Sequence, residues 1–134
     1  MFKVVKQIHF SYAHRITTHR GKCERYHGHN GVVEIECSAS ALNANQMVVD
    51  FDEISKPMKV WIDEQLDHRM ILKEGDPLVD FLKRKGEKHV VLPHEPTAEA
   101  IAQLILDEAR RAGLPVTRVT LWETPNSSAT VVQT

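Results

Sequence analysis

The sequence CERYHGHNGVVEIECSA, residues 23–39, joins a candidate metal site to the clearest strand pattern in the chain. In its second half, apolar residues alternate with polar ones, which predicts a strand over residues 31–39 with one apolar face. In its first half, one residue separates His27 from His29, so in extended backbone their imidazoles project to the same side. The pattern therefore predicts two metal ligands at the entry to a rigid strand.

A third imidazole is available from His14, at the end of the segment FSYAH. Three neutral histidines leave one tetrahedral position of a zinc ion open, which is typical of catalytic rather than structural sites. Cys23 lies four residues before His27. It could complete a closed site as a fourth ligand, or it could remain a nearby thiol that reacts. The residues predict a metal site and leave both roles of the cysteine open.

Length and composition indicate an ordinary globular protein. The chain has 134 residues, 42% hydrophobic and 26% charged, which predicts one domain over residues 1–134 with a core of its own. The formal net charge of -1 indicates neither a nucleic-acid surface nor a membrane-binding face. No apolar run approaches the roughly 20 residues of a membrane span, and the N-terminus shows no signal-peptide pattern. Of two cysteines, Cys37 is expected in the core, so we expect no disulfide framework and a cytoplasmic location.

Apolar periodicity in the rest of the chain predicts an α+β fold. Strands are expected over residues 2–10, with His14 in the loop that follows, and over residues 31–39, 89–92, 116–124 and 128–133. Helices are expected over residues 51–66, from Pro77 through Leu82, and from the cap Thr97 to Gly113. Apart from the short strand over residues 89–92, the expected architecture is a four-stranded, mainly antiparallel sheet with two long helices on one face.

Three further features are candidates for chemistry. Asp67 precedes His68, and an aspartate can hold a histidine tautomer and raise its basicity; an ordinary helix C-cap is the alternative. Glu123 is expected to be partly buried, where a ligand with adjacent ring N–H groups could satisfy it; a salt bridge to Arg118 is the alternative. The basic segment 15–25 is either a solvated loop or a clamp for a polyanionic substrate. The remaining histidines are expected at the surface or in packing contacts: His9, His19, His89 and His94.

Together these stretches resemble the 6-pyruvoyl-tetrahydropterin synthase superfamily over nearly the whole chain. The resemblance rests on residues 10–14, the CxxxHGH of residues 23–29, and residues 48–51, 66–68, 96–99 and 122–125. The number of residues between the cysteine and HGH separates branches of this family. A gap of three residues, as here, resembles the 6-carboxy-5,6,7,8-tetrahydropterin synthase branch, which serves queuosine and other deazapurine pathways. The pyruvoyl branch has a longer gap and ranks second. Ala100 and Leu72 depart from the family, which often has asparagine at both positions.

The resemblance implies three zinc ligands, namely His14, His27 and His29. It implies Cys23 as catalytic base, Asp67 with His68 as a proton relay, and Glu123 as the pterin anchor with Thr97 nearby. The implied enzyme is a zinc-dependent lyase that converts 7,8-dihydroneopterin triphosphate to 6-carboxytetrahydropterin, acetaldehyde and triphosphate. The alternative is a 6-pyruvoyl-tetrahydropterin synthase, which eliminates triphosphate without cleaving a carbon–carbon bond.

The resemblance also implies the tunnelling fold. In this fold the sheets of three subunits close into a barrel, and two such rings stack into a homohexamer. Two readings outside the family stay open. One is a non-catalytic zinc-binding module with one cysteine and three histidine ligands, and the other is a zinc hydrolase unrelated to pterins.

Overall fold

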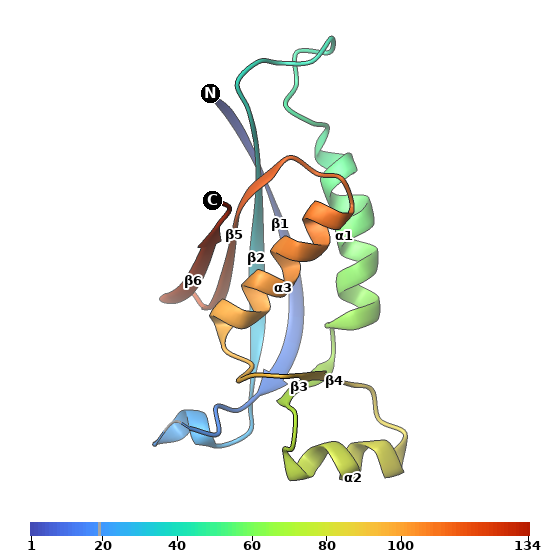
Figure 1. The fold of residues 1–134 in the computed structure, drawn as a ribbon, viewed down its shortest axis with the longest axis vertical. Coiled ribbons are helices and arrows are strands. Elements are labelled where there is room, and N and C mark those ends of the chain that lie inside the picture. Colours follow the sequence, from blue (N-terminus) through green and yellow to red (C-terminus); the bar gives the residue numbers. More distant parts are fainter. Residues whose placement is uncertain (19) are drawn as a thin grey trace.

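The computed structural model describes residues 1–18 and 20–134, so His19 and the expectation placed on it lie outside the described residues. Figure 1 shows a curved sheet with helices along one side. The elements, in chain order, are β1 (Phe2–His14), the 3-10 turn η1 (Lys22–Glu24), β2 (His27–Ala39), α1 (Phe51–Gln65), β3 (Arg69–Lys73), α2 (Pro77–Lys85), β4 (His89–Leu92), α3 (Ala98–Arg111), β5 (Val116–Thr124) and β6 (Ser127–Val132).

Among the described residues, six strands form one sheet in the order β4-β3-β1-β2-β5-β6. The pairs β1–β2, β2–β5 and β5–β6 are antiparallel, whereas β1–β3 and β3–β4 are parallel. The prediction of an α+β fold with a mainly antiparallel sheet is confirmed, but the prediction of four strands is wrong. The short strand β3 follows α1 without a strong turn signal, and it pairs with β1 only at Tyr12 and Ala13.

Strand β1 is longer than the sequence predicts and carries His14 as its last residue. The expectation that His14 lies in a loop is therefore wrong. β1 and β2 pair without interruption from Phe2 opposite Ala39 to His14 opposite His27. This long register holds two candidate metal ligands directly across from each other.

The core lies between the sheet and the two long helices. Alternate residues of β2, such as Val33 and Ile35, are fully buried against Ile62 of α1 and Ile105 of α3 in one continuous cluster. Two long helices on one face are thus confirmed. Cys37 belongs to the same cluster, as expected. The described part of the chain has no helix with the length and apolar character needed to cross a membrane.

Each helix begins at a polar cap. The side chain of Asp50 accepts from Asp52 N–H at α1, and Thr97 accepts from Ala100 N–H at α3. Asp76 caps α2, which lies at the end of the sheet where the β1–β2 loop also lies (Figure 1). This end of the molecule carries the candidate site.

Candidate metal centre and active site

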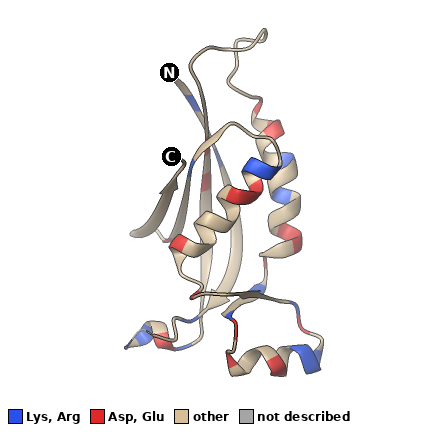
Figure 2. Cartoon of the chain, viewed as in Figure 1, with Lys and Arg blue, Asp and Glu red and all other residues tan. Residues whose placement is uncertain are grey.

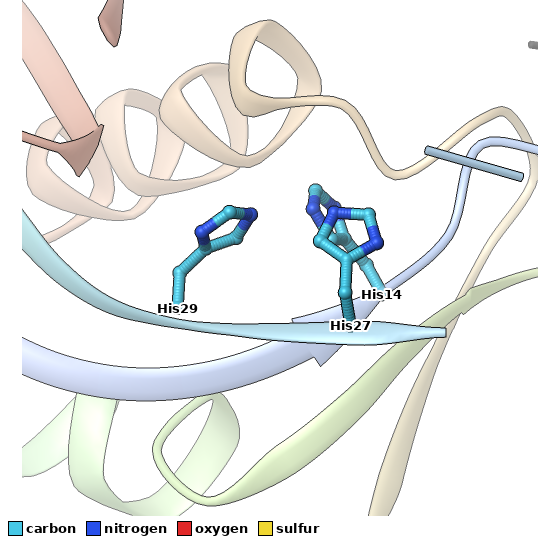
Figure 3. Close-up of side chains that lie close together, drawn as sticks. All are labelled: His14, His27 and His29. Carbon is cyan, nitrogen blue, oxygen red and sulfur yellow. The ribbon is translucent and has the colours of Figure 1, made fainter. Parts of the chain in front are cut away.

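Three histidines converge at the paired ends of β1 and β2 (Figure 3). One ring nitrogen of each of His14, His27 and His29 lies within 4.8 Å of the others. The ring centroids are 4.6 Å apart for His14 and His27, 5.2 Å for His14 and His29, and 5.0 Å for His27 and His29. The register explains this convergence. His27 and His29 are alternate residues of β2, and His14 pairs with His27, so all three side chains lie on one face of the sheet. The cluster could hold a metal ion.

Backbone carbonyls orient two of these rings. His14 Nδ1 lies 2.6 Å from the carbonyl oxygen of Pro96, and His27 Nδ1 lies 2.7 Å from that of Arg25. A carbonyl only accepts, so each Nδ1 carries the proton and each Nε2 keeps a free lone pair. Burial lowers the pKa of His29, which favours the neutral form that binds metals.

The ring nitrogens that face the centre of the cluster fit a metal ion. Nε2 of His14 and Nε2 of His29 are buried and make no hydrogen bond within the described part of the chain. Buried polar atoms are normally satisfied. The Glu123 carboxylate that faces these two orphan nitrogens is itself an acceptor, so their lone pairs need a cation as partner. Imidazole nitrogen is a common ligand of zinc, copper, iron and nickel.

Glu123 at the end of β5 reaches the same nitrogens. Its Oε2 lies 3.2 Å from Nε2 of His14 and 3.1 Å from Nε2 of His29. When His14 is protonated, its Nε2–H donates to Glu123 and lowers the pKa of this carboxyl group, although burial opposes the shift. The carboxylate is therefore ionised at neutral pH. The alternative salt bridge to Arg118 is wrong, because the Arg118 guanidinium lies 3.7 Å from Glu36 instead.

Tyr12 is a site residue that the sequence analysis missed. Its hydroxyl donates to Glu123 Oε2 at 3.2 Å, and its ring centroid lies 5.2 Å from that of His14. Burial and the adjacent carboxylate raise the pKa of Tyr12, so the hydroxyl stays protonated and donates. The signal was its position two residues before His14, which period-two alternation places on the same face once β1 extends that far.

Cys23 lies in η1, within the loop that connects His14 to His27. The thiol is partly buried and free of any disulfide. Its backbone oxygen accepts from Ile16 N–H at 2.7 Å, which draws the two sides of the loop together. Its sulfur is outside the group of mutually close ligand atoms, so this arrangement does not place Cys23 in the ligand set.

Asp67 contacts both the imidazole of His68 and the backbone of β1. Asp67 Oδ1 accepts from Ser11 N–H at 2.8 Å, and Oδ2 lies 2.9 Å from His68 Nδ1. Burial raises the pKa of Asp67, but the Ser11 N–H and His68 outweigh it and lower the pKa overall. The pair therefore contacts a neighbouring strand rather than simply closing the end of α1.

The imidazole of His68 is not part of the three-histidine cluster. Its side chain is 81% exposed, and it lines a cavity of about 500 Å³ together with Ser11 and Asn30. Ser11 and Asn30 are hydrogen-bonded to each other and alternate in β1 and β2 with the residues that face the cluster. His29 lines the same cavity, but His68 is not among the mutually close ligand atoms of the described residues.

Thr97 lies beside the cluster through the backbone. Its hydroxyl accepts from Ala100 N–H at 3.1 Å, and the preceding Pro96 carbonyl binds His14. The start of α3 is thereby tied to the imidazoles. Of the two departures from the family pattern, Ala100 provides this capped N–H, and Leu72 is fully buried in a small cluster under α2.

Comparison with known proteins agrees with this fold and cluster. The family model described as 6-pyruvoyl tetrahydropterin synthase matches residues 3–134, and the chain belongs to this family. The resemblance drawn from the sequence is thus confirmed.

Within the family, the chain is similar to proteins named 6-carboxy-5,6,7,8-tetrahydropterin synthase. The Rickettsia bellii protein is 38% identical over 133 residues, covering 94% of this chain and 96% of that protein. The Haemophilus influenzae protein is 30% identical over 135 residues, covering 95% and 96%.

Solved structures show the same fold. An uncharacterized protein from Wolinella succinogenes superimposes with a TM-score of 0.80 at 28% identity, covering 99% of this chain and 98% of that one. The 6-pyruvoyl tetrahydropterin synthase of Caenorhabditis elegans gives a TM-score of 0.73 at 23% identity, covering 99% and 96%.

Proposed function

We propose that the protein is a zinc-dependent 6-carboxy-5,6,7,8-tetrahydropterin synthase of queuosine or related deazapurine biosynthesis. It would convert 7,8-dihydroneopterin triphosphate and water to 6-carboxytetrahydropterin, acetaldehyde and triphosphate in the cytoplasm. The observation that carries the proposal is the cluster of three imidazoles beside the ionised carboxylate of Glu123. Relatives with this name align with the chain over nearly its whole length.

The three histidines would hold the zinc ion. The orphan nitrogens of His14 and His29 and the carbonyl-oriented ring of His27 support this role. When bound, zinc would supply Lewis acidity toward the side-chain hydroxyls of the substrate.

Glu123 would orient the pterin ring. A carboxylate matches two adjacent N–H donors on the amino-pyrimidine edge, and an ionised acceptor makes stronger hydrogen bonds than a neutral one. The low pKa of Glu123, caused first by His14, supports an acceptor role at neutral pH. Tyr12 holds the carboxylate in place from the side.

Cys23 and the Asp67–His68 pair would move protons. Cys23, as thiolate, would remove a proton from the substrate side chain. Asp67 accepts from His68 Nδ1, which leaves Nε2 as the nitrogen that exchanges protons with the substrate. These transfers would expel triphosphate and then allow the carbon–carbon bond to break.

The placement of His68 supports a site shared between subunits. His68 is not among the mutually close ligand atoms of its own chain, and both groups can serve one substrate if neighbouring chains each supply one part. Open sheet edges support association as well, since residues 2–10 of β1 have β2 as their only strand partner in the described structure. We therefore include a homohexamer, a dimer of trimers, in the proposal. A concentration-independent monomer in light scattering would contradict it.

Basic side chains near the site support a polyanionic substrate. Figure 2 shows basic side chains, with acidic ones among them, at the end of the molecule that carries η1 and α2. Lys22 lies in η1, and Lys83, Arg84 and Lys85 form the last turn of α2. Such side chains would attract a triphosphate by long-range electrostatics.

Incubation of the zinc-loaded protein with dihydroneopterin triphosphate tests the proposal. Acetaldehyde together with a carboxypterin is the expected result. A pyruvoyl pterin without acetaldehyde would instead assign the alternative synthase. Bound zinc with no turnover would favour the non-catalytic zinc-binding module.

A further inference from the structure

Asp76 is a buried carboxylate with more partners than a helix cap needs. Its side chain is 1% exposed. It accepts from the N–H of Leu78 at 2.9 Å, from Nε of Arg15 at 2.9 Å and from the hydroxyl of Tyr26 at 2.7 Å. The first bond is an ordinary N-cap of α2. The other two come from the distant β1–β2 loop.

The two distant partners flank two of the candidate metal ligands. Arg15 directly follows His14, and Tyr26 directly precedes His27. The Arg15 guanidinium lies 4.4 Å from the centre of the Tyr26 ring, so the two side chains also stack on each other. His14 and His27 form the last pair of the β1–β2 register. Asp76 therefore ties the two ends of the loop together at the point where the strand ladder stops.

Comparison with Asp50 separates this clamp from simple capping. Asp50 caps α1 by accepting from Asp52 N–H at 2.8 Å, and it is exposed. Burying a carboxylate costs free energy unless it is fully paired. Burial raises the pKa of Asp76, but its three hydrogen bonds outweigh this and lower the pKa overall. The Asp76 site is thus built around a charged group that receives two loop side chains.

We propose that Asp76 is a positioning residue for the metal centre, because it fixes the chain beside His14 and His27 through Arg15 and Tyr26. This inference rests on the metal role proposed for the imidazole cluster. Without the clamp, the loop beside the last register pair would lose its charged tie and keep weaker contacts, such as the bond from Ile16 N–H to the Cys23 carbonyl. The ligand nitrogens would then spend less time within reach of one ion, and metal affinity would fall.

A second contact explains why loss of the clamp should loosen the loop without unfolding it. Thr17 donates its N–H to Glu95 Oε2 at 3.0 Å, and its hydroxyl also contacts Glu95. Glu95 precedes Pro96, whose carbonyl holds the ring of His14. This contact remains when the Asp76 charge is removed.

The test compares Asp76→Asn with Asp50→Asn. Both substitutions leave a good N-cap residue at the start of a helix, but only the first removes the charged partner of Arg15. Zinc affinity of the metal-free proteins is measured by competition with a chromophoric chelator, and geometry is followed by the visible spectrum of bound Co²⁺. We expect Asp76→Asn to lower zinc affinity about tenfold, the lower end of the range for groups that orient ligands, and to alter the cobalt spectrum. Asp50→Asn should leave both unchanged.

The outcomes separate this inference from the proposed function. If wild-type protein binds zinc and Asp76→Asn binds it equally well with the same cobalt spectrum, Asp76 is only a helix cap and the inference is wrong. If the wild-type protein binds no zinc, the proposed metal centre is wrong and the inference with it. Should Asp76→Asn fail to fold, Tyr26→Phe decides the question, because it keeps the carboxylate and the cap. Unchanged affinity in that variant would overturn the clamp, and a drop of about threefold would support it.

Discussion

Glu123 Oε2 lies 3.1 Å from Nε2 of His29, which brings a carboxylate and an imidazole from two neighbouring strands to one point. The pairing of Val32 with Trp122 produces this approach, because it sets β5 beside the ligand-bearing end of β2. The carboxylate thereby borders the imidazole cluster and can contact any molecule bound there.

Glu123→Gln keeps the shape of the side chain and removes its charge. We expect KM for dihydroneopterin triphosphate to rise about 10- to 100-fold, because hydrogen bonds to charged groups contribute about 1.5–3 kcal/mol. Steady-state kinetics measures the change. Glu34→Gln is a suitable control, because Glu34 is on β2 but bonds Trp122 and Gln7 on the opposite face. An unchanged KM for Glu123→Gln would favour a zinc hydrolase that does not anchor a pterin.

His27→Ala should abolish stable metal binding. The site then has two imidazoles, and we expect zinc content after dialysis to fall from about one ion per chain to nearly none. Elemental analysis of the purified protein measures this. His9→Ala is the matched control, since His9 is an exposed histidine of β1 that alternates with the residues facing the cluster. Full zinc content in His27→Ala would show that the ligand set is wrong.

The two cysteines should differ sharply toward iodoacetamide. Cys37 is fully buried, and burial raises its pKa to about 11, so it should stay unmodified in the folded protein. Cys23 is partly accessible and should be alkylated whether or not zinc is bound. Peptide mapping by mass spectrometry identifies the labelled residue. Protection of Cys23 by zinc would instead identify it as a fourth ligand.

Mixed oligomers should reveal a site shared between chains. Cys23→Ala and His68→Ala should each lose about 100-fold or more in kcat, because each removes an acid–base group. If neighbouring subunits supply these two residues, equal mixtures reassembled from dissociated chains should recover about a quarter of wild-type sites. Turnover of the mixture measures the recovery. No recovery after verified subunit exchange would place both groups in one chain.

The stability that the ionised Asp76 side chain contributes should be lost in acid. Its pKa in the folded state is below the ordinary 3.8, because hydrogen bonds from Leu78, Tyr26 and Arg15 outweigh the effect of burial. A lowered pKa contributes stability above the unfolded-state pKa, and this contribution is lost as pH falls through the folded-state pKa. The free energy of unfolding should therefore fall below about pH 5, and less steeply in Asp76→Asn. Urea unfolding at a series of pH values measures both slopes, and equal slopes would contradict this role.

The features that the sequence predicted well depend on neighbouring residues. Period-two alternation placed His27 and His29 on one face of β2 and Cys37 in the core, and a local cap marked the start of α3 at Thr97. These patterns are visible because strand alternation and helix capping involve residues only a few positions apart.

Only the tertiary structure decided which distant residues share a site. It extended β1 to His14, added β3 and β4 to the sheet, and set Glu123 against the imidazoles. It also joined Asp76 to the loop ends and left His68 outside the imidazole cluster. These contacts join residues that are far apart in the sequence; Tyr26 and Asp76, for example, are 50 positions apart. No local periodicity encodes such pairs, because the packing of the whole sheet and its helices selects them.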